Sequence, residues 1–201
     1  MTTTKKTDGF LDKGRQIVSY SFEQYVEQVK SFHGNTAPGM IIGGFMVDLA
    51  VKNLPDGILY DAISETQSCL PDAVQILTPC TIGNGWLTIL PLGRYAVTLY
   101  DKQTKEGVRV FLDAEKLEPW PEIRKWFLKL VPKNNQDSER LFNETCSAGL
   151  NILGLRHIQI KPDFIGKMHK GKIALCPQCR EAYPANTENL CLACQGETPY
   201  L

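Results

Sequence analysis

The sequence predicts an α+β protein, with an antiparallel sheet packed against helices and a small zinc finger at the C-terminus. Three observations support this fold class. Apolar residues recur with a helical period near the N-terminus and again after residue 120. The middle of the chain is rich in β-branched and aromatic residues, so helices and strands occur in blocks, which favours α+β over a doubly wound sheet. Two close pairs of cysteines lie near the C-terminal end.

The first predicted helix covers residues 21–32. Its apolar side chains recur every three or four positions and share one face: Phe22, Tyr25, Val26, Val29 and Phe32. Ser21 suits the N-cap position, and Gln24 three residues later completes the pattern of a capping box. Local sequence alone therefore predicts where this helix begins.

The second predicted helix covers residues 41–54 and is apolar on almost every side. Such a helix is expected to be buried, and Gly43 and Gly44 would let another backbone segment come close. Pro38 suits the first turn, because the N–H that proline lacks has no helical partner there. The loop 33–37 is then expected at a helix N-terminus.

The middle of the chain predicts an antiparallel meander of three strands, at 86–92, 94–100 and 108–112. A brief helix is predicted at 71–77, while 59–65 is short and ambiguous. Glycines at the end of this helical section indicate a turn into the first strand.

Three further elements are predicted after residue 120: helices at 121–131 and 139–153 and a last strand at 157–161. Beyond Pro162 the composition shifts toward Lys, Gly, Pro and Cys, which marks a domain boundary. The sequence therefore predicts a core domain at 1–161 and a zinc-binding module at 162–201.

The charge balance disfavours nucleic acid as a partner. The chain has 22 Lys and Arg against 22 Asp and Glu, a formal net charge of zero, whereas phosphate binding needs a basic surplus. No apolar stretch approaches the roughly 20 residues that a membrane-spanning helix needs. The polar start, residues 1–9, lacks the apolar core of a secretory signal. We therefore expect a cytoplasmic protein without membrane contact.

Four of the seven cysteines predict a structural zinc site: Cys176, Cys179, Cys191 and Cys194. They form two C-x-x-C pairs with eleven residues between them, and each pair can grasp one edge of a tetrahedron. The module is too short to bury a core of its own. The metal must then supply its folding free energy, on the order of 10–16 kcal/mol in zinc-finger peptides.

A closed four-thiolate site has no open position, so a structural role is favoured over catalysis. Redox chemistry at a C-x-x-C pair is the other interpretation, and two matched pairs argue against it. Protein, nucleic acid and a dimer partner all stay open as contacts of the module. Its modest local positive charge comes from five residues: Lys161, Lys167, Lys170, Lys172 and Arg180.

Three segments of the core carry side chains that ordinary packing does not require: residues 32–39, 65–75 and 78–85. In this order they resemble the signature of the formylmethanofuran dehydrogenase E-subunit family. That signature runs H-G-H-x-C-P-G, then E-T-x-x-C-x-x-D-A-x-Q, then G-C-T-x-G. The resemblance continues into the predicted strands and covers about residues 28–113.

The resemblance implies an α+β core, a homodimer, a treble-clef-like zinc appendage and a role in anaerobic one-carbon metabolism of the kind related to methanogenesis. The family takes its name from an operon, so the resemblance implies a setting and no particular reaction. Two positions depart from the signature. Asn35 stands where the family has its second histidine, and Ala37 where it has a cysteine.

The resemblance leaves His33, Cys80 and Cys69, with water, as ligands of a second metal in the core. A helix between Cys69 and Cys80 would separate them by up to ~16 Å, so we expect His33 to pair with Cys80. The candidate catalytic residues are His33, Cys80 and Asp72. Packing offers alternatives, because free cysteines such as Cys69 and Cys146 are commonly buried, and Asp72 suits the first turn of a helix.

Two hypotheses of function follow. In the first, which we favour, the chain is a metal-binding accessory protein of formyl metabolism, whose core pocket binds a small molecule or a metal and whose zinc module docks to a dehydrogenase or another protein. In the second, it is a metal-dependent enzyme of formyl-group metabolism that uses a His33/Cys80 site. A redox switch ranks behind both. No hydrolase, phosphate-loop or dinucleotide-binding motif is apparent.

Overall fold

The computed structural model describes residues 14–164, 171–185 and 188–200. The chain divides into two compact units, Met1–Gly166 and Lys167–Leu201. In the described residues, the first unit combines helices with a five-stranded sheet, and the second has two short strands and one helical turn. No helix within the described ranges combines the length and the apolar composition that crossing a membrane requires.

The first unit opens with an antiparallel pair of strands, β1 (Gln16–Ile17) and β2 (Tyr20–Ser21), followed by helix α1 (Phe22–His33). The predicted capping box is confirmed. The backbone N–H of Gln24 donates to Oγ of Ser21 over 3.2 Å, and the Ser21 N–H donates to the Gln24 side chain over 2.9 Å. Helix α1 therefore begins where its local sequence predicts.

Helix α2 (Pro38–Lys52) is buried along most of its length. Its two adjacent glycines face different neighbours. A Cβ on Gly43 would lie 2.9 Å from that of Ala73, and one on Gly44 would overlap the ring of Tyr25. The prediction that these glycines permit close approach is therefore confirmed, with α1 against one glycine and the helix that holds Ala73 against the other.

The sheet contains β3 (Tyr60–Ser64), β4 (Leu87–Ile89), β5 (Ala96–Asp101), β6 (Glu106–Leu112) and β7 (Leu153–Gln159). Its strand order is β4-β3-β5-β6-β7, and every pair is antiparallel except β3 with β4. The predicted meander is therefore correct for β5 and β6 and wrong for the first strand, which pairs with β3 instead of β5.

Helix α3 (Leu70–Leu77) explains the parallel pair, because it carries the chain back between β3 and β4 so that both strands run the same way. The ambiguous segment 59–65 contains β3, which lies inside the sheet. Its residues Ala62, Ile63 and Ser64 are all buried, so the strand lacks the alternation that would have indicated it.

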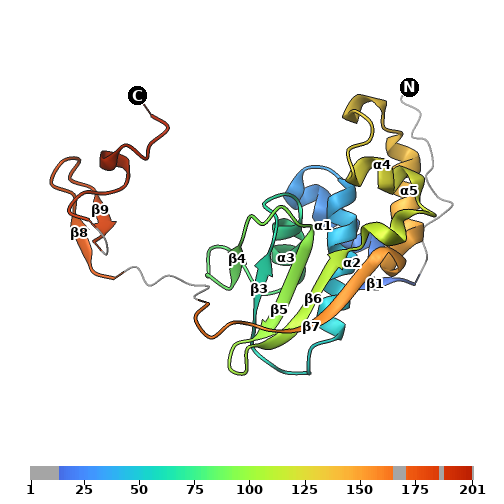
Figure 1. Cartoon of the computed structure of the whole chain (residues 1–201), viewed down its shortest axis with the longest axis horizontal. Coiled ribbons are helices and arrows are strands. Elements are labelled where there is room, and N and C mark those ends of the chain that lie inside the picture. Colours follow the sequence, from blue (N-terminus) through green and yellow to red (C-terminus); the bar gives the residue numbers. More distant parts are fainter. Residues whose placement is uncertain (1–13, 165–170, 186–187, 201) are drawn as a thin grey trace. The chain divides into compact units, whose positions relative to one another are not determined.

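Helices α4 (Pro121–Phe127) and α5 (Ser138–Ala148) follow the sheet's fourth strand. Both end earlier than predicted, and α5 passes into a 3₁₀ turn, Gly149–Ile152, before β7. Other short 3₁₀ turns are Ala114–Leu117 and Lys133–Asn135. Figure 1 shows α1, α2 and α3 stacked against one face of the sheet, and α2 contacts both β5 and β6.

The second unit contains an antiparallel pair, β8 (Ile173–Leu175) and β9 (Ala182–Pro184), and a final 3₁₀ turn, η4 (Ala193–Gln195). Large apolar side chains that are exposed in this unit are Ile173, Leu175, Leu192 and Tyr200. Two strands and a turn leave little apolar surface to bury, so this unit depends on something other than a hydrophobic core.

Candidate functional site

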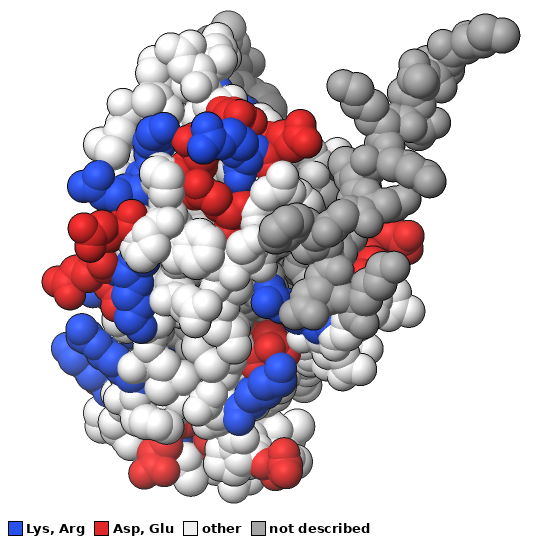
Figure 2. Space-filling view, turned by 90° about the vertical axis from the view of Figure 1, so that its right-hand side faces the viewer, with Lys and Arg blue, Asp and Glu red and all other residues white. Residues whose placement is uncertain are grey.

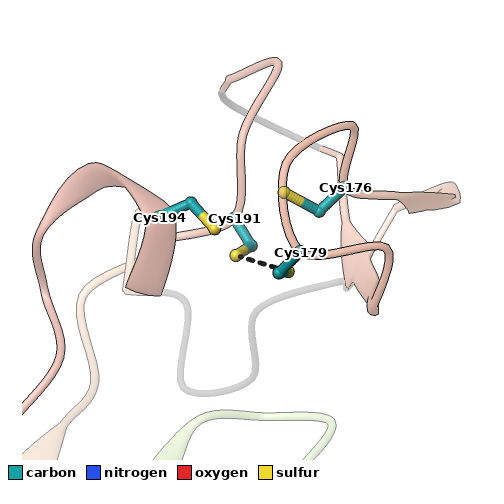
Figure 3. A group of neighbouring side chains, drawn as sticks. All are labelled: Cys176, Cys179, Cys191 and Cys194. Carbon is teal, nitrogen blue, oxygen red and sulfur yellow. Dashed lines mark hydrogen bonds between the residues drawn. The ribbon is translucent and has the colours of Figure 1, made fainter. Parts of the chain in front are cut away.

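Two loops of the second unit bring four cysteine sulfurs together (Figure 3). Cys176 and Cys179 lie between β8 and β9, and Cys191 and Cys194 lie at the turn η4. The four Sγ atoms are within 4.8 Å of one another, and those of Cys179 and Cys191 are 3.7 Å apart. In the part of the chain that the structure describes, no other group of three or more His, Cys, Asp or Glu side chains has this geometry.

This cluster fits a zinc ion. With Zn–S bonds of about 2.3 Å, the edge of a tetrahedron of sulfurs is about 3.8 Å. Backbone hydrogen bonds from Cys191 and Cys179 lower the pKa of Cys176 to about 6, whereas the side-chain hydrogen bond with Cys191 raises the pKa of Cys194 to about 12. Without a cation, these four neighbouring thiols cannot all be deprotonated at neutral pH. A divalent cation stabilises all four thiolates together.

The backbone around the first pair forms the tight turn that such a site needs. The Cys176 N–H donates to the carbonyl of Glu181 over 2.8 Å, and the Arg180 N–H donates to the carbonyl of Cys176 over 2.9 Å. Arg180 has a φ of +69°, which reverses the chain within a few residues. The zinc is therefore structural, and its closed shell of four sulfurs leaves no position for a substrate.

In the first unit, the ring of His33 links two residues at the start of α3. Its Nδ1 lies 2.7 Å from Oδ2 of Asp72, and its Nε2 lies 3.8 Å from Sγ of Cys69. The side chains of His33 and Asp72 are 20% and 33% exposed, and Cys69 is half-buried. Because the Asp72 carboxylate accepts from the Nδ1–H, Nε2 is left to accept the thiol proton. We call Asp72, His33 and Cys69 the thiol relay.

The backbone at Cys69 is held in an unusual conformation. Its φ is +54° and its ψ is −53°, outside the regions that residues with a side chain commonly adopt. Such strain clusters at functional sites, where the surrounding structure enforces it. A Cβ on Gly39 would lie 3.1 Å from Sγ of Cys69 and 2.8 Å from the hydroxyl of Tyr95, so only glycine at the start of α2 leaves room for the thiol.

Burial raises the pKa of the Cys69 thiol, and the charge of Asp72 raises it further. Cys69 at rest is therefore a thiol, held 3.8 Å from Nε2 of His33. Nearby, the Tyr95 hydroxyl donates to the Gly39 carbonyl over 2.6 Å, and burial raises the pKa of Tyr95 well above its ordinary value. The surroundings of the thiol disfavour a negative charge unless a base or a ligand compensates for it.

The structure places Cys80 away from this relay and so corrects the expected pairing with His33. Cys80 is fully buried, and its Sγ donates to the carbonyl of Tyr60 over 3.6 Å. Burial raises the pKa of this thiol to about 11. Helix α3 does separate Cys69 from Cys80 as expected, but the cysteine at its N-terminal end is the one that meets His33. Cys146 is also buried.

The relay lies beside two cavities. The first has a volume of about 920 Å³ and is bounded by the start of α2, the connection between α4 and α5, and α5 itself. The second, of about 610 Å³, is bounded by the connection between β3 and α3, the residues just before β5, strand β6 and the end of α4. Three residues line both cavities: Cys69, Trp126 and Lys129. The thiol is therefore on a wall that both cavities share.

The two departures from the family signature, Asn35 and Ala37, line the first cavity. Cys69 of the relay and these two positions therefore line the same space. His33 and Cys69 provide two metal-ligand side chains, and no group of three in the described residues includes them. The described part of the core thus contains a thiol-bearing cavity without a cluster of three metal-ligand side chains.

The cavity linings are cationic. Among the described lining residues, the charged ones are Lys129 and Lys133 in the first cavity and Arg94, Arg109 and Lys129 in the second. On the face of the molecule in Figure 2, by contrast, Lys and Arg are interspersed with Asp and Glu. Sequence reasoning missed these lining residues, since none belongs to the three signature segments and only the tertiary fold brings them together.

The fold and the two sites define a class of protein: an α+β core with a thiol in a cationic cavity, joined to a four-cysteine zinc finger. A family model described as "FmdE, Molybdenum formylmethanofuran dehydrogenase operon" matches residues 32–158. A second, described as "FmdE treble clef zinc finger", matches residues 167–201. The chain belongs to the FmdE family, as its signature segments predict.

A crystal structure described as that of a tungsten formylmethanofuran dehydrogenase FmdE-like protein from Syntrophus aciditrophicus is similar to this chain. The two are 68% identical with a TM-score of 0.86, over 93% of this chain and 98% of that one. A "Probable S-adenosyl-L-methionine-binding protein" from Archaeoglobus fulgidus is 28% identical over 191 residues, 84% of this chain. The match covers 52% of that relative, so the chain spans about half the length of the curated relative it matches.

Proposed function

We propose that this chain is an accessory protein of one-carbon metabolism that binds a small molecule in the two cavities beside Cys69. One observation carries the proposal: the thiol relay ends on the wall that both cavities share. A cysteine kept only for packing needs neither a strained backbone nor a histidine held by a carboxylate. Concave sites that combine apolar walls with a few placed polar groups are typical of ligand binding.

The lining of the first cavity restricts the ligand. Trp126 and Phe142 offer aromatic rings, Asn35 offers an amide, and Lys129 and Lys133 supply positive charge. A small molecule with a carbonyl or an anionic group fits this chemistry. The sulfonium of S-adenosyl-L-methionine is a cation, and no acidic residue is among the described lining residues, so the ligand named for the Archaeoglobus relative is not favoured here.

The accessory role rests on the family. The name of the family and that of the Syntrophus protein both refer to formylmethanofuran dehydrogenase, which supports a setting in anaerobic formyl metabolism, in the cytoplasm. The zinc module is the proposed docking part, because large apolar side chains such as Ile173, Leu175 and Leu192 are exposed around its closed metal site. A homodimer that docks to a dehydrogenase or another protein belongs to the same proposal.

The thiol relay favours a second candidate, an acyl-transfer enzyme. In that reaction, Sγ of Cys69 attacks a carbonyl carbon, Nε2 of His33 takes the thiol proton and passes it to the leaving group, and a thioester is formed. Asp72 orients the imidazole and stabilises its cationic form. This mechanism needs no metal in the core, and it uses Cys69 in place of the Cys80 expected from sequence.

The binding proposal is tested by protection of Cys69 from iodoacetamide, with peptide mass spectrometry to assign each modified cysteine. Formate, N-formyl amines and thioesters serve as trial ligands. A ligand in the cavities slows modification of Cys69 and leaves Cys80 and Cys146 unchanged as internal controls. Replacing Ser138, which lines the first cavity, by Phe should give the same protection without ligand, whereas Ser147→Phe on the same helix should not. The proposal would be contradicted if no trial ligand slowed the modification of Cys69 and Ser138→Phe left its rate unchanged.

Treatment of the protein with an activated formyl ester distinguishes the acyl-transfer enzyme from a protein that only binds its ligand. Formylation of Cys69 that is lost in Cys69→Ser and slowed in His33→Ala would support acyl transfer. Protection without formylation would support the accessory role. Elemental analysis of wild type and Cys69→Ala measures the metal content. One zinc per chain in both would mean that only the four-cysteine cluster binds metal. A second metal equivalent that is lost in Cys69→Ala would mean that the core binds a metal at Cys69.

A further inference from the structure

The side chains that line the second cavity carry more positive charge than the nearby acidic side chain neutralises. Arg94, Arg109 and Lys129 line it, and no acidic side chain is among the described lining residues. The acid behind this wall is Glu65, whose side chain is 6% exposed. One carboxylate therefore faces two guanidinium groups, and the pair of arginines retains a net positive charge.

The ion pairs also leave hydrogen-bond donors available. Arg109 uses Nε and Nη2 on the two oxygens of Glu65, over 2.6 Å and 2.8 Å. Arg94 approaches Oε2 of Glu65 with its Nε, at 2.7 Å, so its two terminal nitrogens can donate elsewhere. Its side chain is 60% exposed, whereas that of Arg109 is 17% exposed. Arg109 is thus the fixed cation and Arg94 the accessible one.

The arginine pair is held before any ligand arrives. Burial alone would raise the pKa of Glu65, but the hydrogen bond and charge of Arg109, with those of Arg94, keep it below its ordinary value. Arg109 also lies over the ring of Phe111, with Cζ 5.2 Å from the ring centroid. Pre-positioned guanidinium groups lose little conformational entropy when they bind an anion.

We propose that the second cavity binds the oxyanion of the ligand, a carboxylate or phosphate, at Arg94 and Arg109, with Thr66 and Ser68 on the same wall. This inference rests on the proposed function and names its substrate class: an organic anion whose other end reaches the thiol of Cys69. Planar guanidinium groups match both oxyanions. Trp126, which lines both cavities, offers a surface for the part of the ligand between the anion and the thiol.

The test compares two alkylating probes that differ in charge. Iodoacetate carries a carboxylate and iodoacetamide is neutral, and both modify thiols by displacing iodide. The ratio of their rates at Cys69, mapped by peptide mass spectrometry, is measured for wild type, Arg94→Gln and Arg94→Lys. Arg140→Gln removes an exposed charge that lines neither cavity and serves as the matched control.

Removing the accessible positive charge should lower the iodoacetate-to-iodoacetamide ratio by about fivefold in Arg94→Gln, the effect of about 1 kcal/mol between two unit charges about 4 Å apart in bulk water. Arg94→Lys should keep most of the ratio, and Arg140→Gln all of it. The iodoacetamide rate should change less than the iodoacetate rate in both Arg94 variants, because iodoacetamide is neutral. A ratio in Arg94→Gln equal to that of wild type would overturn the anion site while leaving the thiol and the proposed function intact.

A second measurement does not depend on the thiol. Calorimetric titration of the full chain with succinate and, separately, with inorganic phosphate distinguishes the two oxyanions, and binding should weaken about fivefold in Arg94→Gln. Binding of one anion that Arg94→Gln weakens supports the site even if Cys69 proves unreactive, which would count against the proposed function alone. Failure of both anions to bind wild type would overturn the anion site.

Discussion

The zinc site and the thiol relay hold their cysteine sulfurs in place by different means. All four zinc ligands lie within one short unit, on two turns, and a metal ion supplies the stability. The relay takes its residues from the end of α1 and the start of α3, and packing supplies the stability. The first site is closed and has no room for chemistry, whereas the second opens onto two cavities.

Loss of one zinc ligand should have the largest effect on stability, and it should affect the second unit alone. Cys179→Ser removes a thiolate, so the zinc affinity falls and the second unit loses a folding free energy on the order of 10–16 kcal/mol. The expected result is a chain without zinc by elemental analysis, with residues 167–201 sensitive to protease. The first unit should keep its unfolding temperature, because its core is independent of the metal.

Cys146→Ala is the matched control, since Cys146 is a buried cysteine of the first unit. It should keep one zinc per chain and lose stability only in the first unit. A chain with Cys179→Ser that still binds one zinc tightly would mean that the cluster is not the metal site.

Glu65→Gln should have the second-largest effect and should act on the core alone. Removing one partner of a buried pair leaves Arg109 without its carboxylate, at a cost of about 3 kcal/mol. The folded pKa of Glu65 is lowered, so its contribution is complete above the ordinary value of 4.5 and disappears as the pH falls through the lower folded value. Urea unfolding of wild type and variant should therefore differ at pH 7 and converge in acid.

Glu118→Gln, at an exposed position, controls for the loss of one negative charge and should leave the urea midpoint nearly unchanged. The zinc content of Glu65→Gln should equal that of wild type. A difference between Glu65→Gln and wild type that persists undiminished in acid would show that charge pairing is not the source of the effect.

The contrast between the two sites explains what the sequence could predict. The zinc ligands and the capping box at Ser21 depend on spacings of three residues within one turn, so a local pattern predicted both. Which cysteine meets His33 depends on which end of α3 lies beside α1, because Cys69 directly precedes the helix and Cys80 follows it by three residues. The parallel strand β4 and the lining residue Arg109 depend on pairings across the sheet, which no local pattern contains.

Ser21→Ala tests the capping box that the local sequence predicts. It should lower the free energy of unfolding by about 1 kcal/mol, because the N–H of Gln24 loses its acceptor. The measurement is the free energy of unfolding in urea. Ser31→Ala, at an exposed position inside the same helix, should be neutral or slightly stabilising, since alanine is the better helix former. Equal losses in the two variants would show that the cap contributes nothing specific.

Asp72→Asn should have the smallest effect, and it acts on the relay itself. Burial is the first cause of the raised pKa of Cys69 and the Asp72 charge is the second, so the variant should lower that pKa partway toward its ordinary value of 9.0. A lower pKa means more thiolate at pH 8, so iodoacetamide should modify Cys69 faster there, with the pH profile shifted to lower pH. Asp56→Asn, at an exposed position, should leave the profile unchanged.

A shift to higher pH in Asp72→Asn would instead mean that the carboxylate supports a cationic His33 beside a thiolate, the ion pair found in activated cysteine nucleophiles. His33→Ala then becomes informative, because loss of an imidazolium would raise the pKa of Cys69, whereas loss of a neutral imidazole removes a base without that shift. The direction of the two profiles therefore decides whether Cys69 rests as a thiol, as its burial indicates, or as a thiolate.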